Sequence, residues 1–223
     1  MNSRYLARLE LLLWLYALPY DPKYPVVCFD ERPCFLIGDC IEPLAMQTGR
    51  VRKEHYAYKK LGSCALFAAI EPLTGFRLAQ VHPRRTKKEY TLFCQALAAE
   101  FPDASKIRLV QDNLNTHDAS AFYENLPADE AQALADRFEF FYTPKSASWL
   151  NMIEIEFSAL TRLCLARRIP TIEQLEREVL AIVADRAEKR IKISWQFSLQ
   201  SARSKLNSHY VKVHSGNQKF KET

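Results

Sequence analysis

The sequence contains little glycine and lacks several signatures of common protein classes. Only 5 of its 223 residues are glycine, and none belongs to a glycine-rich loop of the kind that holds nucleotide phosphates. No internal repeat or low-complexity segment is present, which argues against solenoid and low-complexity classes. The six cysteines form no C-x-x-C pair. A zinc site is therefore not expected, and we interpret the cysteines as reduced core residues of a cytoplasmic protein.

No apolar run has the length of a membrane span. Residues 4–18 come closest, but Glu10 interrupts them and they are shorter than the ~20 apolar residues that cross a bilayer. No small-x-small cleavage site follows, so a signal peptide is not indicated. We predict an amphipathic helix that packs on the body of the protein and ends at Pro19 and Pro22. Residues 1–22 would form this N-terminal helix and a linker.

The composition permits a large core and an acidic partner. Hydrophobic residues make up 48% of the chain, and the formal net charge is +5, which suits a polyanion without proving one. Basic residues gather near residues 50–60, with two tyrosines among them, and again near residues 84–88. This mixture is typical of contacts with phosphates and bases, although a solvated loop is an equal alternative. The candidate DNA-binding residues are Arg50, Arg52, Lys53, Lys59, Lys60, Arg84, Arg85 and Lys87.

The hydrophobic pattern predicts an α/β protein. Short apolar runs indicate five strands, in chain order, at residues 26–29, 63–70, 76–82, 107–110 and 138–142. Residues 34–37 are a candidate continuation of the first strand after Pro33. Helical spacing or a capping residue indicates helices after Thr86, from about 119, at 128–137, from 153, after Thr171 and at 199–210. This order predicts a mixed five-stranded sheet with helices on both faces. Residues 23–210 would form one domain, followed by a flexible tail at 211–223.

Three carboxylates stand at unusual places in this pattern. Asp30 follows the first strand, Asp112 follows the fourth, and Glu154 comes early in a helix. If those two strands are neighbours, the three side chains converge. Oxygen ligands of this kind suit Mg²⁺ or Mn²⁺, and two such ions can act on a phosphodiester. Taken alone, Asp112 would more often open a surface turn, and Glu154 would more often favour a helix dipole.

Three sequence blocks resemble the catalytic blocks of DDE transposases, most closely the mariner-like branch of bacterial insertion sequences, the insertion sequence 630 family. They are residues 29–32 (FDER), 112–117 (DNLNTH) and 148–154 (SWLNMIE). Residues 56–62, 84–86, 142–145 and 195–197 also look like that family. The resemblance covers about residues 19–210. Relatives carry helix-turn-helix domains before the catalytic domain, and we expect this chain to lack that region.

The resemblance implies an RNase H-like fold and metal-dependent cleavage and transfer of DNA strands. It assigns Asp30, Asp112 and Glu154 as catalytic and metal-binding residues, with Mg²⁺ or Mn²⁺ as cofactor and two ions expected. Asn113, His117 and Asn151 would shape the active-site loop, although a lone histidine is more often a packing or surface residue. The expected partners are double-stranded DNA at transposon ends and target, and either a second copy or a subunit with the helix-turn-helix domain. The expected location is the bacterial cytoplasm, at the nucleoid.

Several departures from the family pattern leave alternatives open. The spacing between Asp112 and Glu154 is longer than in mariner relatives, and Ser146 stands where relatives commonly have histidine. A truncated, non-catalytic transposase fragment that binds DNA or a partner subunit is therefore the main alternative. Another RNase H-like nuclease is a third.

Overall fold

A five-stranded mixed sheet forms the centre of the protein. The computed structural model describes all residues except 43–47, 49–54, 115–116 and 222–223. The strand order is β3-β2-β1-β4-β5. β1 pairs antiparallel with β2 and parallel with β4, β2 pairs antiparallel with β3, and β4 pairs parallel with β5. The strands are β1 (Val26–Asp39), β2 (Tyr58–Glu71), β3 (Phe76–His82), β4 (Ile107–Gln111) and β5 (Phe138–Tyr142). The predicted mixed sheet is confirmed.

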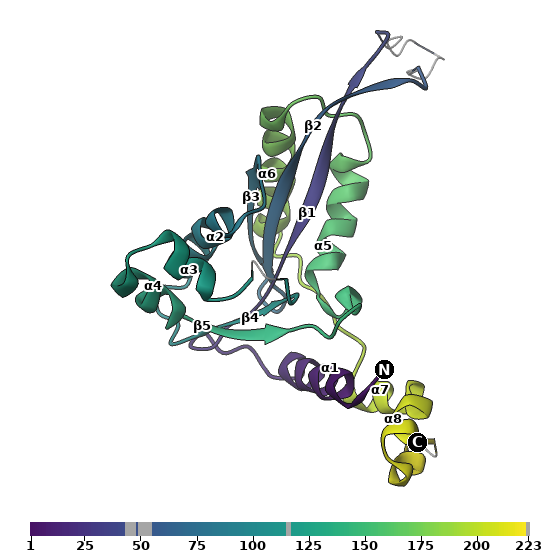
Figure 1. The fold of residues 1–223 in the computed structure, drawn as a ribbon. Coiled ribbons are helices and arrows are strands. Elements are labelled where there is room, and N and C mark those ends of the chain that lie inside the picture. Colours follow the sequence, from purple (N-terminus) through teal and green to yellow (C-terminus); the bar gives the residue numbers. More distant parts are fainter. Residues whose placement is uncertain (43–47, 49–54, 115–116, 222–223) are drawn as a thin grey trace.

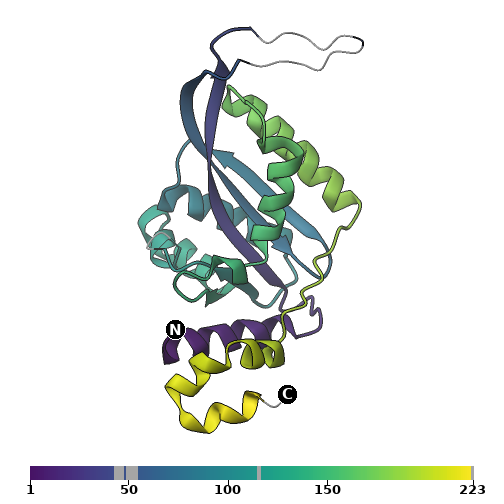
Figure 2. The same ribbon diagram turned by 90° about the vertical axis from the view of Figure 1, so that its right-hand side faces the viewer.

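Helices cover both faces of this sheet (Figures 1 and 2). Alternate residues of β1 point to opposite faces. Val27 and Phe29 join a core with Phe93 of α2, whereas Cys28 joins a core with Phe157 of α5. The first face carries α2 (Lys87–Glu100), α3 (Ser120–Asn125) and α4 (Ala128–Ala135), and the second carries α5 (Ile153–Leu160) and α6 (Ile172–Glu188). Two separate apolar layers therefore hold the sheet in place.

The chain ends lie together below the sheet (Figure 2). α1 (Ser3–Tyr16) begins at an Asn2 cap and buries Leu6, Leu9 and Leu12, which confirms the predicted amphipathic helix. Its Glu10 forms a bidentate ion pair with Arg203, with distances of 2.7 and 2.8 Å. None of the helices in the described part of the chain is both long and apolar enough to cross a membrane.

The predicted single helix at 199–210 is wrong. The chain forms α7 (Leu199–Lys205) and α8 (Asn207–Val213), followed by a short 3₁₀ helix, η3 (Ser215–Lys221). The break falls at Leu206, whose backbone has left the helical region at φ −104° and ψ 16°. The turn lets the chain fold back, so that Tyr210 of α8 contacts Phe220 of η3 with ring centroids 5.7 Å apart.

The first strand is much longer than its apolar run predicts. β1 continues beyond Phe29 to Asp39, and β2 starts at Tyr58, so Lys59 and Lys60 of the basic stretch belong to a strand. The register places Asp39 opposite Tyr58. β4 reaches only as far as Cys28, which leaves one edge of β1 without a strand partner from there on. Pro33, which has no N–H, is tolerated in such an edge.

Candidate active site

Asp30 and Asp112 lie at equivalent positions of two neighbouring strands. Cys28 of β1 is opposite Val110 of β4, and each aspartate comes two residues later. Because side chains alternate along a strand, Asp30 belongs to the sheet face of Cys28, which is the face under α5, whereas Asp112 follows Gln111, the last residue of β4. The prediction that Asp30 ends its strand is wrong, because β1 continues. It is β4 that ends here and opens the space beside Asp30.

Glu154 approaches the same place from the first turn of α5. Asn151, three residues before Glu154, is only 1% exposed, and its Nδ2 donates a 2.8 Å hydrogen bond to the carbonyl oxygen of Phe29. The carbonyl oxygen of Asn151 accepts a 3.2 Å hydrogen bond from the backbone N–H of Glu154. One buried amide therefore connects the residue before Asp30 to the turn that carries Glu154.

The electrostatics of Asp30 reveal the proximity of the three carboxylates. Burial raises the pKa of Asp30 to about 7, and the charges of Asp112 and Glu154 add to the rise. The backbone N–H of Glu31, 2.7 Å from Asp30 Oδ1, and the charge of His117 oppose it. Asp30 thus holds its proton up to neutral pH unless another positive charge arrives.

His117 lies between the carboxylates of Asp112 and Glu31. Its Nδ1 is 2.6 Å from Asp112 Oδ1, and its Nε2 is 3.5 Å from Glu31 Oε2. Burial lowers the pKa of His117, but the hydrogen bonds and charges of Asp112 and Glu31 outweigh burial and raise that pKa to about 9. The imidazole is therefore a cation at neutral pH. It holds one oxygen of Asp112 in a fixed direction.

Buried polar side chains fix the backbone of His117. Gln111 Nε2 donates a 2.7 Å hydrogen bond to the His117 carbonyl oxygen, and Gln111 Oε1 accepts one of 2.8 Å from the Tyr90 hydroxyl. The Tyr142 hydroxyl also donates to the His117 carbonyl at 3.2 Å. Tyr90 stacks on the imidazole, with ring centroids 5.0 Å apart. Sequence reasoning missed this support, because Gln111 and Tyr90 lie in ordinary strand and helix patterns.

The donor chemistry of the three carboxylates fits a hard divalent cation. Asp30, Asp112 and Glu154 supply only oxygen ligands, which Mg²⁺ and Mn²⁺ prefer. Burial is the main cause of the raised pKa of Asp30, and the nearby charges of Asp112 and Glu154 add to it. Within the described residues, no three His, Cys, Asp or Glu side chains are assembled as a ready-made metal-binding cluster. The three carboxylates are therefore close enough for the charges of Asp112 and Glu154 to act on Asp30. Metal binding by these residues stays a prediction.

Glu31 and Glu156, which lie close in sequence to Asp30 and Glu154, form ion pairs with other residues. Glu156 is 2% exposed and lies between two arginines, Arg77 and Arg186. Arg186 binds it with two hydrogen bonds of 2.8 and 3.0 Å. The arginines outweigh burial and lower the pKa of Glu156. Glu31 faces His117 and Arg85. Glu156 thus acts as a structural ion-pair partner, which agrees with the assignment of Glu154 to the site.

The candidate DNA-binding residues do not form one compact patch. Arg50, Arg52 and Lys53 lie outside the described residues. Lys59 is opposite Gly38 of β1, whereas Arg85 contacts Glu31, so seven residues of β1 separate the two groups. That is about 23 Å of strand. Of the second group, Lys87 already pairs with Glu124, while Arg84 is exposed.

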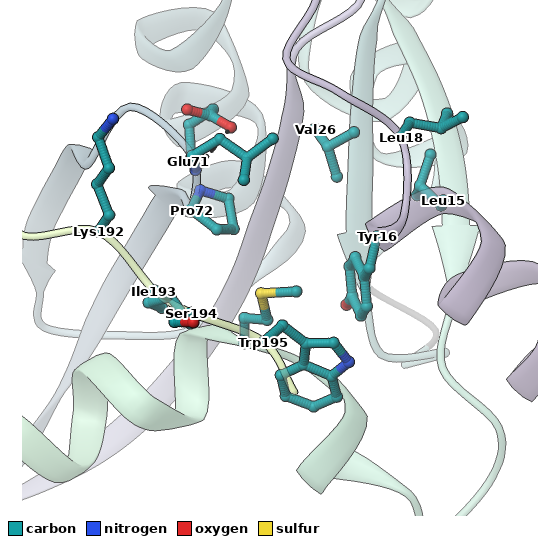
Figure 3. Close-up of a pocket in the computed structure, with 12 residues that line it drawn as sticks. Leu15, Tyr16, Leu18, Val26, Glu71, Pro72, Lys192, Ile193, Ser194 and Trp195 are labelled. Atoms are coloured by element: carbon teal, nitrogen blue, oxygen red, sulfur yellow. Dashed lines mark hydrogen bonds between the residues drawn. The ribbon is translucent and has the colours of Figure 1, made fainter. Parts of the chain in front are cut away.

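A cavity of about 390 Å³ lies at the start of β1, between α1, the turn after β2 and residues 192–195 (Figure 3). None of the three candidate carboxylates lines it. Its one acidic residue, Glu71, already accepts hydrogen bonds from the backbone N–H groups of Leu73 and Thr74, the first at 3.1 Å and the second at 2.5 Å. Tyr16 and Trp195 meet edge to face across it, with centroids 5.5 Å apart. This cavity is a packing junction, separate from the candidate active site.

Two solved structures of Mos1 complexes are similar to this chain. Its fold is similar to that of the Mos1 strand transfer complex, with a TM-score of 0.52 and 15% identity over 84% of this chain and 60% of that one. It is also similar to the Mos1 transposase paired-end complex with left transposon end, with a TM-score of 0.50 and 15% identity over 86% and 62%. At this identity the likeness supports the expected RNase H-like fold alone. The chain spans about 60% of the length of the Mos1 chain in the strand transfer complex.

Sequence comparison assigns the family directly. No curated protein sequence matches the chain. A family model described as DDE superfamily endonuclease matches residues 25–176, a range that makes up more than half of the chain and includes Asp30, Asp112 and Glu154. The chain therefore belongs to the DDE superfamily of endonucleases.

Proposed function

We propose that this protein is the catalytic domain of a DDE transposase that cleaves DNA at transposon ends and transfers the cut strands. The mariner-like insertion sequence 630 family and the bacterial cytoplasm are parts of this proposal. The observation that carries it is Asp30, a buried acid whose pKa is raised to about 7 by burial and by Asp112 and Glu154. A protein that placed three acids together for stability alone would gain nothing from this repulsion.

Asp30, Asp112 and Glu154 would hold Mg²⁺ or Mn²⁺. When bound, two such ions would lower the pKa of an attacking water or hydroxyl and stabilise the leaving oxygen. The protein's own residues do the positioning. Asn151 fixes the distance between the strand with Asp30 and the helix with Glu154. His117 holds one Asp112 oxygen, Oδ1.

Binding to DNA is the second part of the proposal. Lys59, Lys60, Arg84 and Arg85 are exposed and would contact phosphates, which carry no sequence information. Binding by this chain should therefore be non-specific and strongly salt-dependent, with a Kd on the order of 10⁻⁴–10⁻⁶ M. Preference for terminal repeats would require a helix-turn-helix unit, supplied by a partner subunit or a fused domain. A homodimer that pairs two DNA ends is the expected assembly.

The deciding experiment is metal-dependent cleavage of DNA. Nicking of a supercoiled plasmid that carries the element's ends should require Mg²⁺ or Mn²⁺ and stop with EDTA. Asp112→Asn should abolish it, because the amide keeps the shape but removes a charge that the cation needs. Asp103→Asn changes an exposed aspartate that precedes β4, whereas Asp112 follows that strand; it is the matched control and should nick like the parent. Undiminished nicking by Asp112→Asn would show that the activity comes from another protein, and a parent that binds DNA without nicking it would favour the non-catalytic fragment.

A further inference from the structure

The geometry points to a groove beside Asp112 that holds an unpaired nucleotide of the DNA strand, with its base stacked on Trp149 and its phosphates facing Arg4, Arg8 and Lys145. The inference deepens the proposed function and rests on it for one point, namely that the phosphate next to this nucleotide is the one that reacts. None of these four residues is among the DNA-binding candidates found in the sequence.

The groove opens directly next to the candidate active site. It is a hollow of about 860 Å³ between the first two turns of α1, the residue after Asp112, and the loop that precedes α5. Asn113 lines it from one side, and Trp149, which stands five residues before Glu154, lines it from the other. A strand held here is therefore bordered by the segments that carry two of the three carboxylates.

The lining of the groove is positively charged. Arg4 and Arg8 are four residues apart in α1 and therefore lie on one face of the helix. Lys145 adds a third positive charge, and none of the described residues that line the hollow is acidic. Among the residues that the structure describes, none of these three cations forms an ion pair. Uncompensated cations around a concave surface raise the local concentration of a polyanion.

Trp149 presents an aromatic surface in this charged hollow. Its side chain belongs to η1 (Ser148–Leu150) and is 46% exposed, which is uncommon for a residue of this size. Phe197 supports it from one side at a centroid distance of 5.5 Å and an angle of 69°. Burial raises the pKa of the Tyr5 hydroxyl, and the proximity of the Trp149 side chain partly offsets that rise. The indole is thus held in place while part of it stays open.

The loop beside Trp149 has a strained backbone. Ser146 has a φ of 61°, a left-handed conformation that non-glycine residues rarely adopt. Strain of this kind is concentrated at functional sites, where the surrounding structure holds it in place. Ser146 also lines the groove, next to Lys145.

The aromatic surface identifies the ligand as an unpaired nucleotide. Bases inside a duplex already stack on their neighbours, so a tryptophan can stack only on a base that has left the helix or belongs to a single strand. Cations alone would bind duplex and single strand alike. The combination of three cations with one open indole therefore favours a strand end or a flipped base.

Binding can be measured separately from cleavage, with EDTA present. The probes are a single-stranded oligonucleotide that contains 2-aminopurine and the duplex of the same sequence. Trp149→Ala should weaken single-strand binding about tenfold and duplex binding much less, and Trp149→Phe should retain most of the affinity. Trp14→Ala is the matched control, because Trp14 is 49% exposed on α1 and does not line the groove.

Two double variants test the positive charges of the groove. All the side chains that they change are partly or fully exposed. Arg4→Gln/Arg8→Gln should reduce the slope of log K against log salt by about 1.4 for the single strand, because each lost phosphate contact removes about 0.7. Arg177→Gln/Lys212→Gln removes the same charge from exposed positions outside the groove and should leave the slope nearly unchanged.

The binding and nicking results test the groove and the proposed function independently. Equal single-strand affinity for the parent, Trp149→Ala and Arg4→Gln/Arg8→Gln would overturn the groove even if the parent nicks DNA and Asp112→Asn does not. If Trp149→Ala lost the same affinity for duplex as for single-stranded DNA, the inference that the groove binds an unpaired nucleotide would be wrong. Loss of single-strand binding in the groove variants alone, with a parent that nicks no DNA, would support the groove as a strand-binding site and contradict the proposed function.

Discussion

The side-chain amide of Asn151 donates a 2.8 Å hydrogen bond to the backbone carbonyl of Phe29. Both partners are buried, and each is a close sequence neighbour of a candidate catalytic residue, Asp30 for Phe29 and Glu154 for Asn151. A contact between residues 122 positions apart in the sequence thus sets the relative positions of a strand carboxylate and a helix carboxylate.

Asn151→Ala should therefore reduce both stability and cleavage. It leaves the Phe29 carbonyl buried without a partner, which costs about 1–3 kcal/mol in the free energy of unfolding. Urea unfolding and nicking at saturating Mg²⁺ measure the two effects. Asn207→Ala is the control, because Asn207 is also buried and donates a 2.9 Å hydrogen bond to Asn217, far from the carboxylates in the chain. It should lower stability and leave nicking intact; equal losses of nicking in both variants would refute the positioning role.

Glu154 and Glu156 should differ in what their loss affects. Glu156→Gln breaks a buried ion-pair group with Arg77 and Arg186 and should lower the free energy of unfolding by about 3–5 kcal/mol. Glu154→Gln removes one of three mutually repelling charges, so stability should change by no more than about 0.5 kcal/mol while cleavage is lost. Urea unfolding measures the stability of both variants, and a nicking assay measures their cleavage activity. The reverse pattern would make Glu156 the catalytic residue.

Glu31→Gln should weaken metal binding through His117. Glu31 Oε2 lies 3.5 Å from His117 Nε2, and His117 in turn holds Asp112. Partners that orient a metal ligand through another residue typically contribute 10–100-fold in metal affinity, so the Mn²⁺ concentration at half-maximal nicking should rise by about that factor, with the maximal rate recovered at high Mn²⁺. Glu124→Gln, which breaks the surface pair with Lys87, should leave the Mn²⁺ dependence unchanged. An unchanged Mn²⁺ dependence in Glu31→Gln would contradict the role.

Attachment of α1 to α7 should depend on pH through Glu10. The hydrogen bond from Arg203 outweighs burial and holds the pKa of Glu10 below its ordinary value of 4.5. A folded-state pKa below the unfolded one contributes stability that is present above pH 4.5 and is lost as the pH falls through the folded pKa. The stability difference between the parent and Glu10→Gln should therefore shrink as the solution is acidified below pH 4.5. Glu130→Gln, at an exposed position of α4, should show no such trend, and a constant difference for Glu10→Gln would refute the linkage.

The sequence by itself determined the elements whose causes are local. The apolar runs predicted five strands, and Thr86 with Glu89 predicted the start of α2, where the structure shows the reciprocal capping hydrogen bonds. Local order also placed Asp30 and Asp112 directly after apolar runs, but it left open whether those strands are neighbours, which the sheet order decides. The motif blocks pointed to the DDE family that the family model confirms.

Only the tertiary structure decided what depends on residues far apart in the chain. The sequence offered residues 34–37 as a continuation of the first strand, and the pairing with β2 from Cys28 to Asp39 makes the whole stretch one strand. The same holds for the roles of acids that look alike in the sequence. Glu156 is neutralised by arginines from β3 and α6, whereas Glu154 is left to the candidate site. Arg4 and Arg8 lie beside Asn113 only because α1 packs beneath the sheet, through apolar contacts that no short window of sequence contains.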